Sequence, residues 1–296
     1  PGPREGPYKP KPHEIAYAHG LALGDVVVRK GTGNHTWVAL LSTTKPAMID
    51  VFAETYGRLS KLGYVRAYPD RDEVTGYKWR LRAYLPDDVG KVLSIKSLDV
   101  INMYSKDEEL LMAFIAGLID SDGTVAIYVT RKRIPRERIV VDYTIAIYSS
   151  NKEFLEKLRE ALRMYGYELR IRLNSKAIGK PHTKGLPRYR NIWEIYTQNS
   201  LTISKLLPKI LKYMKHKEKV EKAKLLLGVV TGKIPKDPEL ISKTVKEMNK
   251  RNLRSRNESV KEAKQLNIEG YVRIIYPDLR KEDIPKGTRI RAGTLF

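Results

Sequence analysis

Two short segments of the chain end in an aspartate at matching positions. Ala116–Gly123 ends with Asp122 and a glycine, and His19–Val26 carries Asp25 at the corresponding place. If both segments are helices that pack side by side and in parallel, their aspartates meet at one end of the pair. Two close carboxylates repel each other unless a cation lies between them, and hard oxygen ligands favour Mg²⁺. Metal ions held in this way can catalyse the hydrolysis of a phosphodiester.

Small residues recur at every fourth position in both segments, which predicts a helix face that another helix can approach closely. A glycine inside a helix costs about 1 kcal/mol relative to alanine, so its repeated use indicates a packing requirement. We expect the two stripes to face each other, and we expect His19 to be packed and hydrogen-bonded beside them. The stripes consist of Ala16, Gly20 and Gly24 in the first segment and Ala113, Gly117 and Ser121 in the second.

The elements that must position these aspartates form a long internal repeat. In each half the apolar pattern predicts the order αββαββα, an α+β fold, and the first aspartate-bearing helix is predicted over 14–25. Gly63 and Gly166 follow the middle helix of each half, where a helix-ending glycine is expected. The predicted boundaries are an N-terminal arm at 1–13, a first half at 14–105, a second half at 106–231 and a basic C-terminal extension at 232–296.

The extension matches neither half. Its pattern predicts two short helices, 239–250 and 259–266, joined by the basic run 251–256. It could hold flanking DNA or pack on the second half, and the sequence favours neither.

Composition restricts the class of protein and its partners. The 296 residues include 56 Lys and Arg against 34 Asp and Glu, a net charge of +22 that calls for a polyanionic partner. Apolar residues at 42% indicate a packed core, and the absence of cysteine excludes disulfides and thiolate metal sites. No apolar run is long enough to cross a bilayer. We therefore expect a soluble, cytoplasmic, DNA-associated protein without a membrane partner, and the charge-rich, amide-poor composition is typical of thermophilic prokaryotes.

Basic residues alternate with apolar residues along several predicted strands. Residues 77–83 place three cations on one face and Trp79, Leu81 and Ala83 on the other. A ribbon of this kind fits the major groove of DNA, where arginine and lysine contact bases and phosphates. Two such sheets would cover about two helical turns of duplex. The predicted DNA-binding residues are Arg29, Lys30, Lys78, Arg80, Arg82, Arg131, Lys132, Arg133, Arg170, Arg172, Arg188 and Arg190.

The segment Ala116–Gly123 resembles the signature of the LAGLIDADG homing endonucleases, and the duplicated layout resembles their single-chain, two-motif members. The resemblance covers about residues 14–230. It implies saddle-shaped sheets that pack through the two parallel motif helices. It also implies a metal site formed by Asp25, Asp122, Gly24 and Ser121. The first motif is degenerate, since Leu23 replaces an aspartate and Val26 replaces the final glycine. The resemblance also implies a basic catalytic residue, for which Lys215 has a suitable position in the second half.

The activity that this resemblance implies is site-specific double-strand cleavage of DNA by a monomer that uses Mg²⁺, for which Ca²⁺ or Mn²⁺ could substitute. A role in intron homing accompanies that activity. The chain lacks the terminal residues of an active intein. Degeneracy of the first motif keeps two alternatives open: an RNA maturase or DNA-binding protein that does not cleave, and a nickase that cuts one strand.

Overall fold

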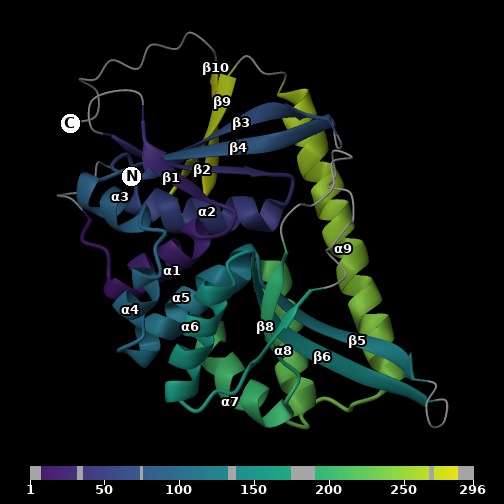
Figure 1. The fold of residues 1–296 in the computed structure, drawn as a ribbon. Coiled ribbons are helices and arrows are strands. Elements are labelled where there is room, and N and C mark those ends of the chain that lie inside the picture. Colours follow the sequence, from purple (N-terminus) through teal and green to yellow (C-terminus); the bar gives the residue numbers. More distant parts are fainter. Residues whose placement is uncertain are drawn as a thin grey trace. The chain divides into compact units, whose positions relative to one another are not determined.

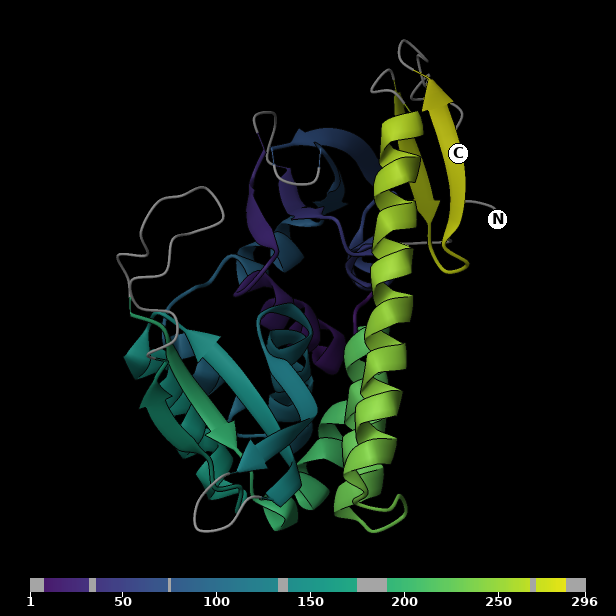
Figure 2. The same ribbon diagram turned by 90° about the vertical axis from the view of Figure 1, so that its right-hand side faces the viewer.

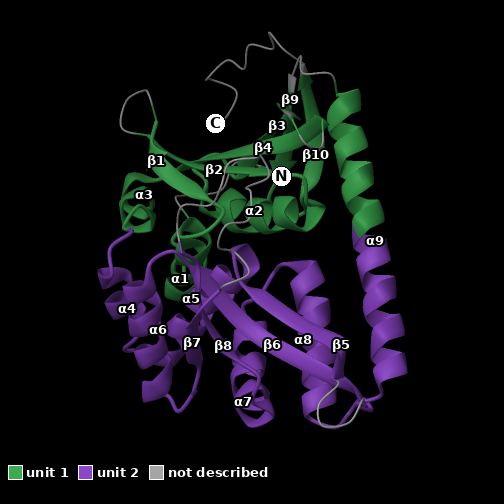
Figure 3. Cartoon of the chain, turned by 45° about the vertical axis from the view of Figure 1, so that its right-hand side comes forward, with its two compact units in different colours: residues 1–95, 253–296 green, residues 96–252 purple. Residues whose placement is uncertain are grey.

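The computed structural model describes residues 8–31, 36–73, 76–132, 138–174, 191–266 and 270–285. The chain divides into two compact units, each described by itself below (Figure 3). Unit 1 comprises residues 1–95 and 253–296, and unit 2 comprises residues 96–252. The 232–296 segment therefore contributes residues to both units.

Unit 1 is built around an antiparallel sheet in the order β1-β2-β4-β3-β9-β10, of which the last two strands are β9 (Gly270–Ile275) and β10 (Arg280–Pro285). Helix α2 packs on one face of it (Figure 1). The elements of the N-terminal part are α1 (Pro12–Ala22), β1 (Val27–Lys30), β2 (Trp37–Thr43), α2 (Pro46–Leu59), β3 (Tyr64–Asp72), β4 (Gly76–Leu85) and α3 (Asp87–Leu93).

Alternation along β4 sorts its side chains as the sequence predicts. Trp79, Leu81 and Ala83 are at most 3% exposed and contribute to the core. The intervening basic residues are half-buried or exposed, and they lie on the opposite face. One face of the sheet is thus apolar core and the other is cationic.

Unit 2 contains a second antiparallel sheet, in the order β5-β6-β8-β7. The α+β class and the pair of antiparallel sheets are therefore confirmed. The elements of this unit before its last helix are α4 (Asp99–Tyr104), α5 (Glu108–Ser121), β5 (Thr124–Lys132), β6 (Arg138–Ser149), α6 (Lys152–Met164), β7 (Arg170–Leu173), β8 (Trp193–Thr197), α7 (Ser200–Leu211) and α8 (Lys217–Val230).

The internal repeat is visible in backbone detail. Gly63 after α2 and Gly166 after α6 both have positive φ, 67° and 79°. This left-handed conformation is easy for glycine and costly for other residues. Gly166 directly follows Tyr165, the C-cap of α6, and ends that helix as predicted. Gly63 does not end α2, which stops at Leu59 with Ser60 as its C-cap; the Gly63 amide instead donates to the Ser60 carbonyl at 3.2 Å in the turn before β3.

The C-terminal segment differs from the prediction of two short helices. Residues 238–265 form one helix, α9 (Pro238–Gln265), which Figure 2 shows as a continuous rod beside the hairpin of β9 (Gly270–Ile275) and β10 (Arg280–Pro285). The basic run 251–256 contains neither glycine nor proline, and arginine is a good helix former, so nothing interrupts the helix. None of the described helices is both long and apolar enough to span a membrane.

The two ends of α9 are anchored differently. Ile241 is fully buried in the unit 2 core, in a cluster with Ile127 and Val229. In unit 1 the indole nitrogen of Trp79 donates to both the carbonyl and the hydroxyl oxygen of Ser259, at 3.1 Å each. The helix thereby carries the chain to β9, which pairs with β3.

Candidate functional site

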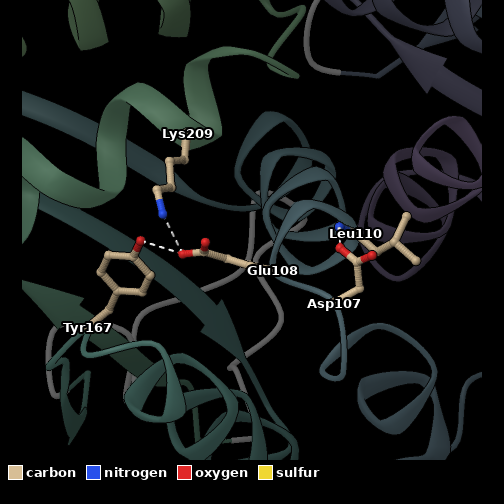
Figure 4. Close-up of polar contacts among 5 residues, drawn as sticks. All are labelled: Asp107, Glu108, Leu110, Tyr167 and Lys209. Atoms are coloured by element: carbon tan, nitrogen blue, oxygen red, sulfur yellow. Dashed lines mark hydrogen bonds and ion pairs between the residues drawn. The ribbon is translucent and has the colours of Figure 1, made fainter.

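Helix α5 carries the more complete aspartate motif. Asp107 caps its first turn by accepting a hydrogen bond from the Leu110 amide at 3.1 Å. Glu108 accepts hydrogen bonds from the Tyr167 hydroxyl and the Lys209 ammonium, at 2.6 Å each (Figure 4). These contacts hold the pKa of Glu108 below its ordinary value, the bond from Lys209 having the largest effect, although partial burial opposes the shift. The helix is buried from residue 111 to residue 121.

The end of α5 presents Asp122 to solvent. The amides of Asp122 and Gly123 both donate to the Leu118 carbonyl at 3.0 Å, which closes the helix just before the chain enters β5. A β-carbon at Gly123 would lie 2.5 Å from the Ile119 α-carbon. Glycine is therefore required here, because the chain turns back against the helix that it has just left.

Lys219 of α8 binds the same helix end. Its ammonium donates to the carbonyl oxygens of Ile119 at 2.6 Å, Asp120 at 3.0 Å, Ser121 at 2.9 Å and Gly123 at 3.0 Å. Carbonyls at a helix C-terminus lack partners within the helix and carry partial negative charge, so a cation stabilises them. The sequence gives little sign of this role, since Lys219 is one of several lysines in a run.

Asp120 holds the segment that contains Lys215. The Asp120 side chain is fully buried, and its Oδ2 accepts hydrogen bonds from the backbone amides of Lys215 at 2.6 Å and His216 at 3.1 Å. The backbone of Lys215, the predicted basic residue, is thus hydrogen-bonded to the motif helix at a position two residues before Asp122. Asp120 is a second functional candidate, with a positioning role that sequence reasoning did not assign.

The motif of unit 1 repeats part of this geometry. The Val26 amide donates to the Leu21 carbonyl at 3.2 Å, as the Gly123 amide does to Leu118 in unit 2. Asp25 is exposed, like Asp122. The prediction of a helix to Asp25 is wrong, however, because α1 ends at Ala22 and residues 23–25 form a turn.

Gly24 consequently lies outside the helix, whereas Ser121 is the last residue of α5. Glycine is a poor helix former, and its presence before Asp25 favours the earlier end. Among the remaining stripe residues, Ala16, Gly20, Ala113, Gly117 and Ser121 are buried.

His19 is a packed, hydrogen-bonded residue, as predicted. It is fully buried, and its Nε2 lies 2.7 Å from the Ile95 carbonyl oxygen. Burial lowers the pKa of His19 below its ordinary value, with the bond to Ile95 acting in the opposite direction.

The predicted DNA-binding residues of unit 1 gather on the β-sheet. Arg29 and Lys30 are exposed on the edge strand β1, and β4 presents its three cations on the face away from the core. Arg80 forms an ion pair of 2.7 Å with Asp70 on β3.

The predicted DNA-binding residues of unit 2 are exposed in the part of the chain that the structure describes. Lys132 pairs with Asp142 at 3.0 Å, and Arg172 pairs with the buried Glu194 and stacks on Tyr196. Arg131 and Arg170 are exposed on β5 and β7. Arg133, Arg188 and Arg190 lie outside the described residues.

Within the described ranges, no group of three or more His, Asp or Glu side chains is arranged to hold a metal ion. Any metal bound at Asp122 therefore needs other oxygen ligands, such as water or a phosphate.

Comparison with known protein families gives a match within unit 2. Residues 109–203 match the model of the LAGLIDADG-like domain. A search of curated protein sequences gives no significant match. The match begins at the second residue of α5 and includes both residues that end the motif, Asp122 and Gly123.

Three solved structures illustrate the similarity of fold. The homing endonuclease I-WcaI bound to its DNA recognition sequence aligns with a TM-score of 0.50 and 15% identity, covering 71% of this chain and 86% of that one. I-DmoI in complex with DNA and Ca aligns with a TM-score of 0.42 and 16% identity, covering 68% and 90%. Meganuclease I-SmaMI bound to uncleavable DNA aligns with a TM-score of 0.45 and 11% identity, covering 79% and 97%. Residues 109–203 thus match a LAGLIDADG-like domain, and the fold of the chain is similar to that of the homing endonuclease I-WcaI.

Proposed function

We propose that this chain is a monomeric, site-specific DNA endonuclease of the homing type, which hydrolyses one phosphodiester in each strand of a target about two helical turns long. The observation that carries the proposal is the exposed Asp122 at the end of a buried helix, inside a segment that matches the LAGLIDADG-like domain. The matching amide contacts of Val26 and Gly123 support an equivalent role for Asp25. The charge of +22 supports a polyanionic substrate.

Asp25 and Asp122 would hold divalent ions, with Mg²⁺ as the expected metal. An exposed carboxylate suits Mg²⁺, which retains several waters and is commonly held by one or two carboxylates together with substrate phosphates. Ser121, whose carbonyl accepts a hydrogen bond from Lys219, would lie beside the metal. Gly24 would have the corresponding position in unit 1. When bound, the metal would lower the pKa of a water and stabilise charge on the phosphate.

The side chains of the protein have separate tasks in this proposal. Asp122 supplies a carboxylate whose direction is set by the closed end of α5. Lys215 supplies a positive charge near the attacked phosphate, and Asp120 fixes the backbone from which that charge projects. The cationic sheet faces hold the duplex through its phosphates and read bases in the major groove.

A strand-specific nickase is the second candidate, because the two motifs differ. In unit 2 Lys219 binds the helix end and the Asp120 side chain accepts from the Lys215 amide, whereas unit 1 has Leu23 in the position of Asp120 and its helix stops earlier. If only one unit positions its catalytic aspartate correctly, the protein would cut only one strand.

A pool of randomised duplexes tests the proposal. The protein is incubated with the pool and Mg²⁺, cleaved duplexes are sequenced, and the selected target is used for strand-resolved assays. Cleavage at a defined sequence is expected. Selective binding without cleavage in Mg²⁺ or Mn²⁺ would contradict the proposal and favour a DNA-binding protein or an RNA maturase. The proposal extends to intron homing, which rests on the resemblance of the motif to those of homing endonucleases, and to a prokaryotic cytoplasm, for which the charge-rich composition is the support.

A further inference from the structure

Three arginines form a row across neighbouring strands of unit 1. Arg66 on β3 lies opposite Arg82 on β4 and also opposite Arg273 on β9. Adjacent strands are about 4.8 Å apart, so residues in register have neighbouring side chains on the same face of the sheet. Val65 and Val272 point to the opposite face and are buried in the core. The row lies on the face that carries the cations of β4, and the C-terminal hairpin supplies its third member.

Tyrosine rings hold these guanidinium groups. Arg66 stacks on Tyr84 and Tyr271, with distances of 5.2 and 5.1 Å to the ring centroids. The corresponding distance is 5.9 Å from Arg82 to Tyr68 and 4.9 Å from Arg273 to Tyr64. Stacked arginines lose less conformational freedom when they bind a ligand, because their side chains are already ordered.

The charge of the row is poorly balanced within the described part of the chain. The carboxylate paired with the row is Glu282, at 3.8 Å from Arg273. The Nε atoms of Arg66, Arg82 and Arg273 are buried and have no hydrogen-bond partner among the described residues. Like charges directly opposite each other destabilise a sheet. An anion bound to the row from outside the chain would reduce the repulsion between these arginines.

The stacking also indicates which nucleic acid fits. Recognition of single-stranded RNA on a sheet uses aromatic rings on which the bases stack. Here the rings of Tyr64, Tyr68, Tyr84 and Tyr271 already lie against guanidinium groups. The Arg66 guanidinium also donates to the Tyr84 hydroxyl at 3.5 Å. A guanidinium carries five N–H donors in a planar fork, a geometry that suits the phosphates of a duplex.

We propose that the C-terminal hairpin extends the DNA interface of unit 1, and that the row Arg82–Arg66–Arg273 binds backbone phosphates of duplex DNA. The proposal deepens the endonuclease function proposed above and rests on it. The hairpin is held in place for this task by β9–β3 pairing and by an ion pair of 2.8 Å between Lys281 and Glu262 of α9. Arg66 and Arg273 are absent from the DNA-binding residues that alternation in the sequence predicts.

Salt dependence of DNA binding tests this proposal separately from cleavage. A 40 base-pair fluorescent duplex of random sequence is titrated with the full-length protein in Ca²⁺ at several salt concentrations. Each phosphate contact contributes about 0.9 to the slope of log K against log salt. Arg66→Ala and Arg273→Ala should each lower that slope by about 0.9, and Arg273→Lys, which keeps the charge, should retain it. The matched control is Arg163→Ala, which removes an exposed arginine from helix α6 of unit 2 and should leave the slope unchanged.

The outcomes distinguish a direct phosphate contact from a structural role of the arginines and from an effect of net charge. Thermal unfolding first establishes that each variant is folded, and Arg273→Met, which keeps the packing of the alkyl chain on Tyr64, replaces the alanine variant if the hairpin is lost. An unchanged slope in folded Arg66 and Arg273 variants would overturn the proposal. An equal decrease in Arg163→Ala would also overturn it, because the effect would then come from net charge. The protein could also bind single-stranded RNA more tightly than the duplex. If the Arg66 variant loses that preference, the row binds RNA and the proposal is wrong. None of these results depends on whether the protein cleaves, so the endonuclease proposal can fail independently.

Discussion

The Lys219 ammonium lies 2.9 Å from the carbonyl oxygen of Ser121, the residue that immediately precedes Asp122. Three more carbonyls of the same helix end accept hydrogen bonds from this ammonium. A side chain of α8 thereby fixes the backbone from which the proposed metal-binding carboxylate projects. The position of Asp122 depends on a residue about one hundred positions away in the sequence.

Replacing Lys219 should weaken both stability and cleavage. Lys219→Met removes a charge-assisted contact to four carbonyls, and we expect the free energy of unfolding to fall by about 2 kcal/mol. Cleavage in Mg²⁺ should fall about tenfold or more, because small displacements of catalytic groups are costly. Urea unfolding and a cleavage time course measure the two effects. The control is Lys224→Met on the exposed side of α8, for which neither quantity should change. Normal cleavage by Lys219→Met would show that this contact does not position Asp122.

Asp120 should control the segment that contains Lys215. Asp120→Ala removes the acceptor for two backbone amides, and two unsatisfied amides predict a loss of about 2–4 kcal/mol in unfolding free energy. Asp120→Asn keeps an acceptor oxygen and should cost less. Hydrogen exchange of the Lys215 and His216 amides measures the local effect and should accelerate in the alanine variant. If their exchange is unchanged in folded Asp120→Ala, the hydrogen bonds do not hold this segment.

The sequence predicts elements with a strong local pattern and misses contacts between distant segments. The spacing of small residues predicts α5, and the alternation in residues 77–83 predicts the two faces of β4. By contrast, the lysines of residues 212–224 are alike in sequence, and only the fold shows that Lys219 reaches the end of α5. The row of Arg82, Arg66 and Arg273 depends in the same way on β9 pairing with β3, which no local pattern specifies.

The positions of the helix ends are also only partly predictable from the sequence. The matching motifs predict equal helices, but α1 stops at Ala22 while the corresponding helix continues to Ser121. The difference follows from glycine at position 24, together with contacts that bind the end of α5 from α8.

His19 should make the stability of unit 1 depend on pH. Its pKa in the folded protein lies below the ordinary 6.5, because the ring is buried. Above pH 6.5 the ring is neutral in both states. As the pH falls below that value, the unfolded chain takes up a proton that the folded protein resists, so stability decreases. Hydrogen exchange of the α1 amides is measured between pH 7.5 and pH 5 in the unmodified protein and in His19→Gln. The ratio of the two exchange rates should change as the pH falls. A ratio that is independent of pH would contradict the prediction.

Glu108 should stabilise the start of α5 only when it is ionised. Its pKa is lowered from the ordinary 4.5, mainly by the hydrogen bond from Lys209. The stabilisation is therefore present at neutral pH and is lost as the pH falls below 4.5 through the pKa of the folded protein. Glu108→Gln should lower Tm at pH 7, and the difference from the unmodified protein should shrink toward pH 3. Thermal unfolding across this range is the measurement, and a constant difference would mean that charge has no part in the effect.

The most direct test of the proposed function is strand-resolved cleavage of the selected target by Asp122→Asn and Asp25→Asn. Both strands of an end-labelled duplex are followed in Mg²⁺, and binding to the same duplex is measured in Ca²⁺. Each substitution removes one carboxylate charge from an exposed position, so binding should be retained while cutting falls by at least a hundredfold in one or both strands. Undiminished cutting of both strands by either variant would contradict the role of the two aspartates in the reaction.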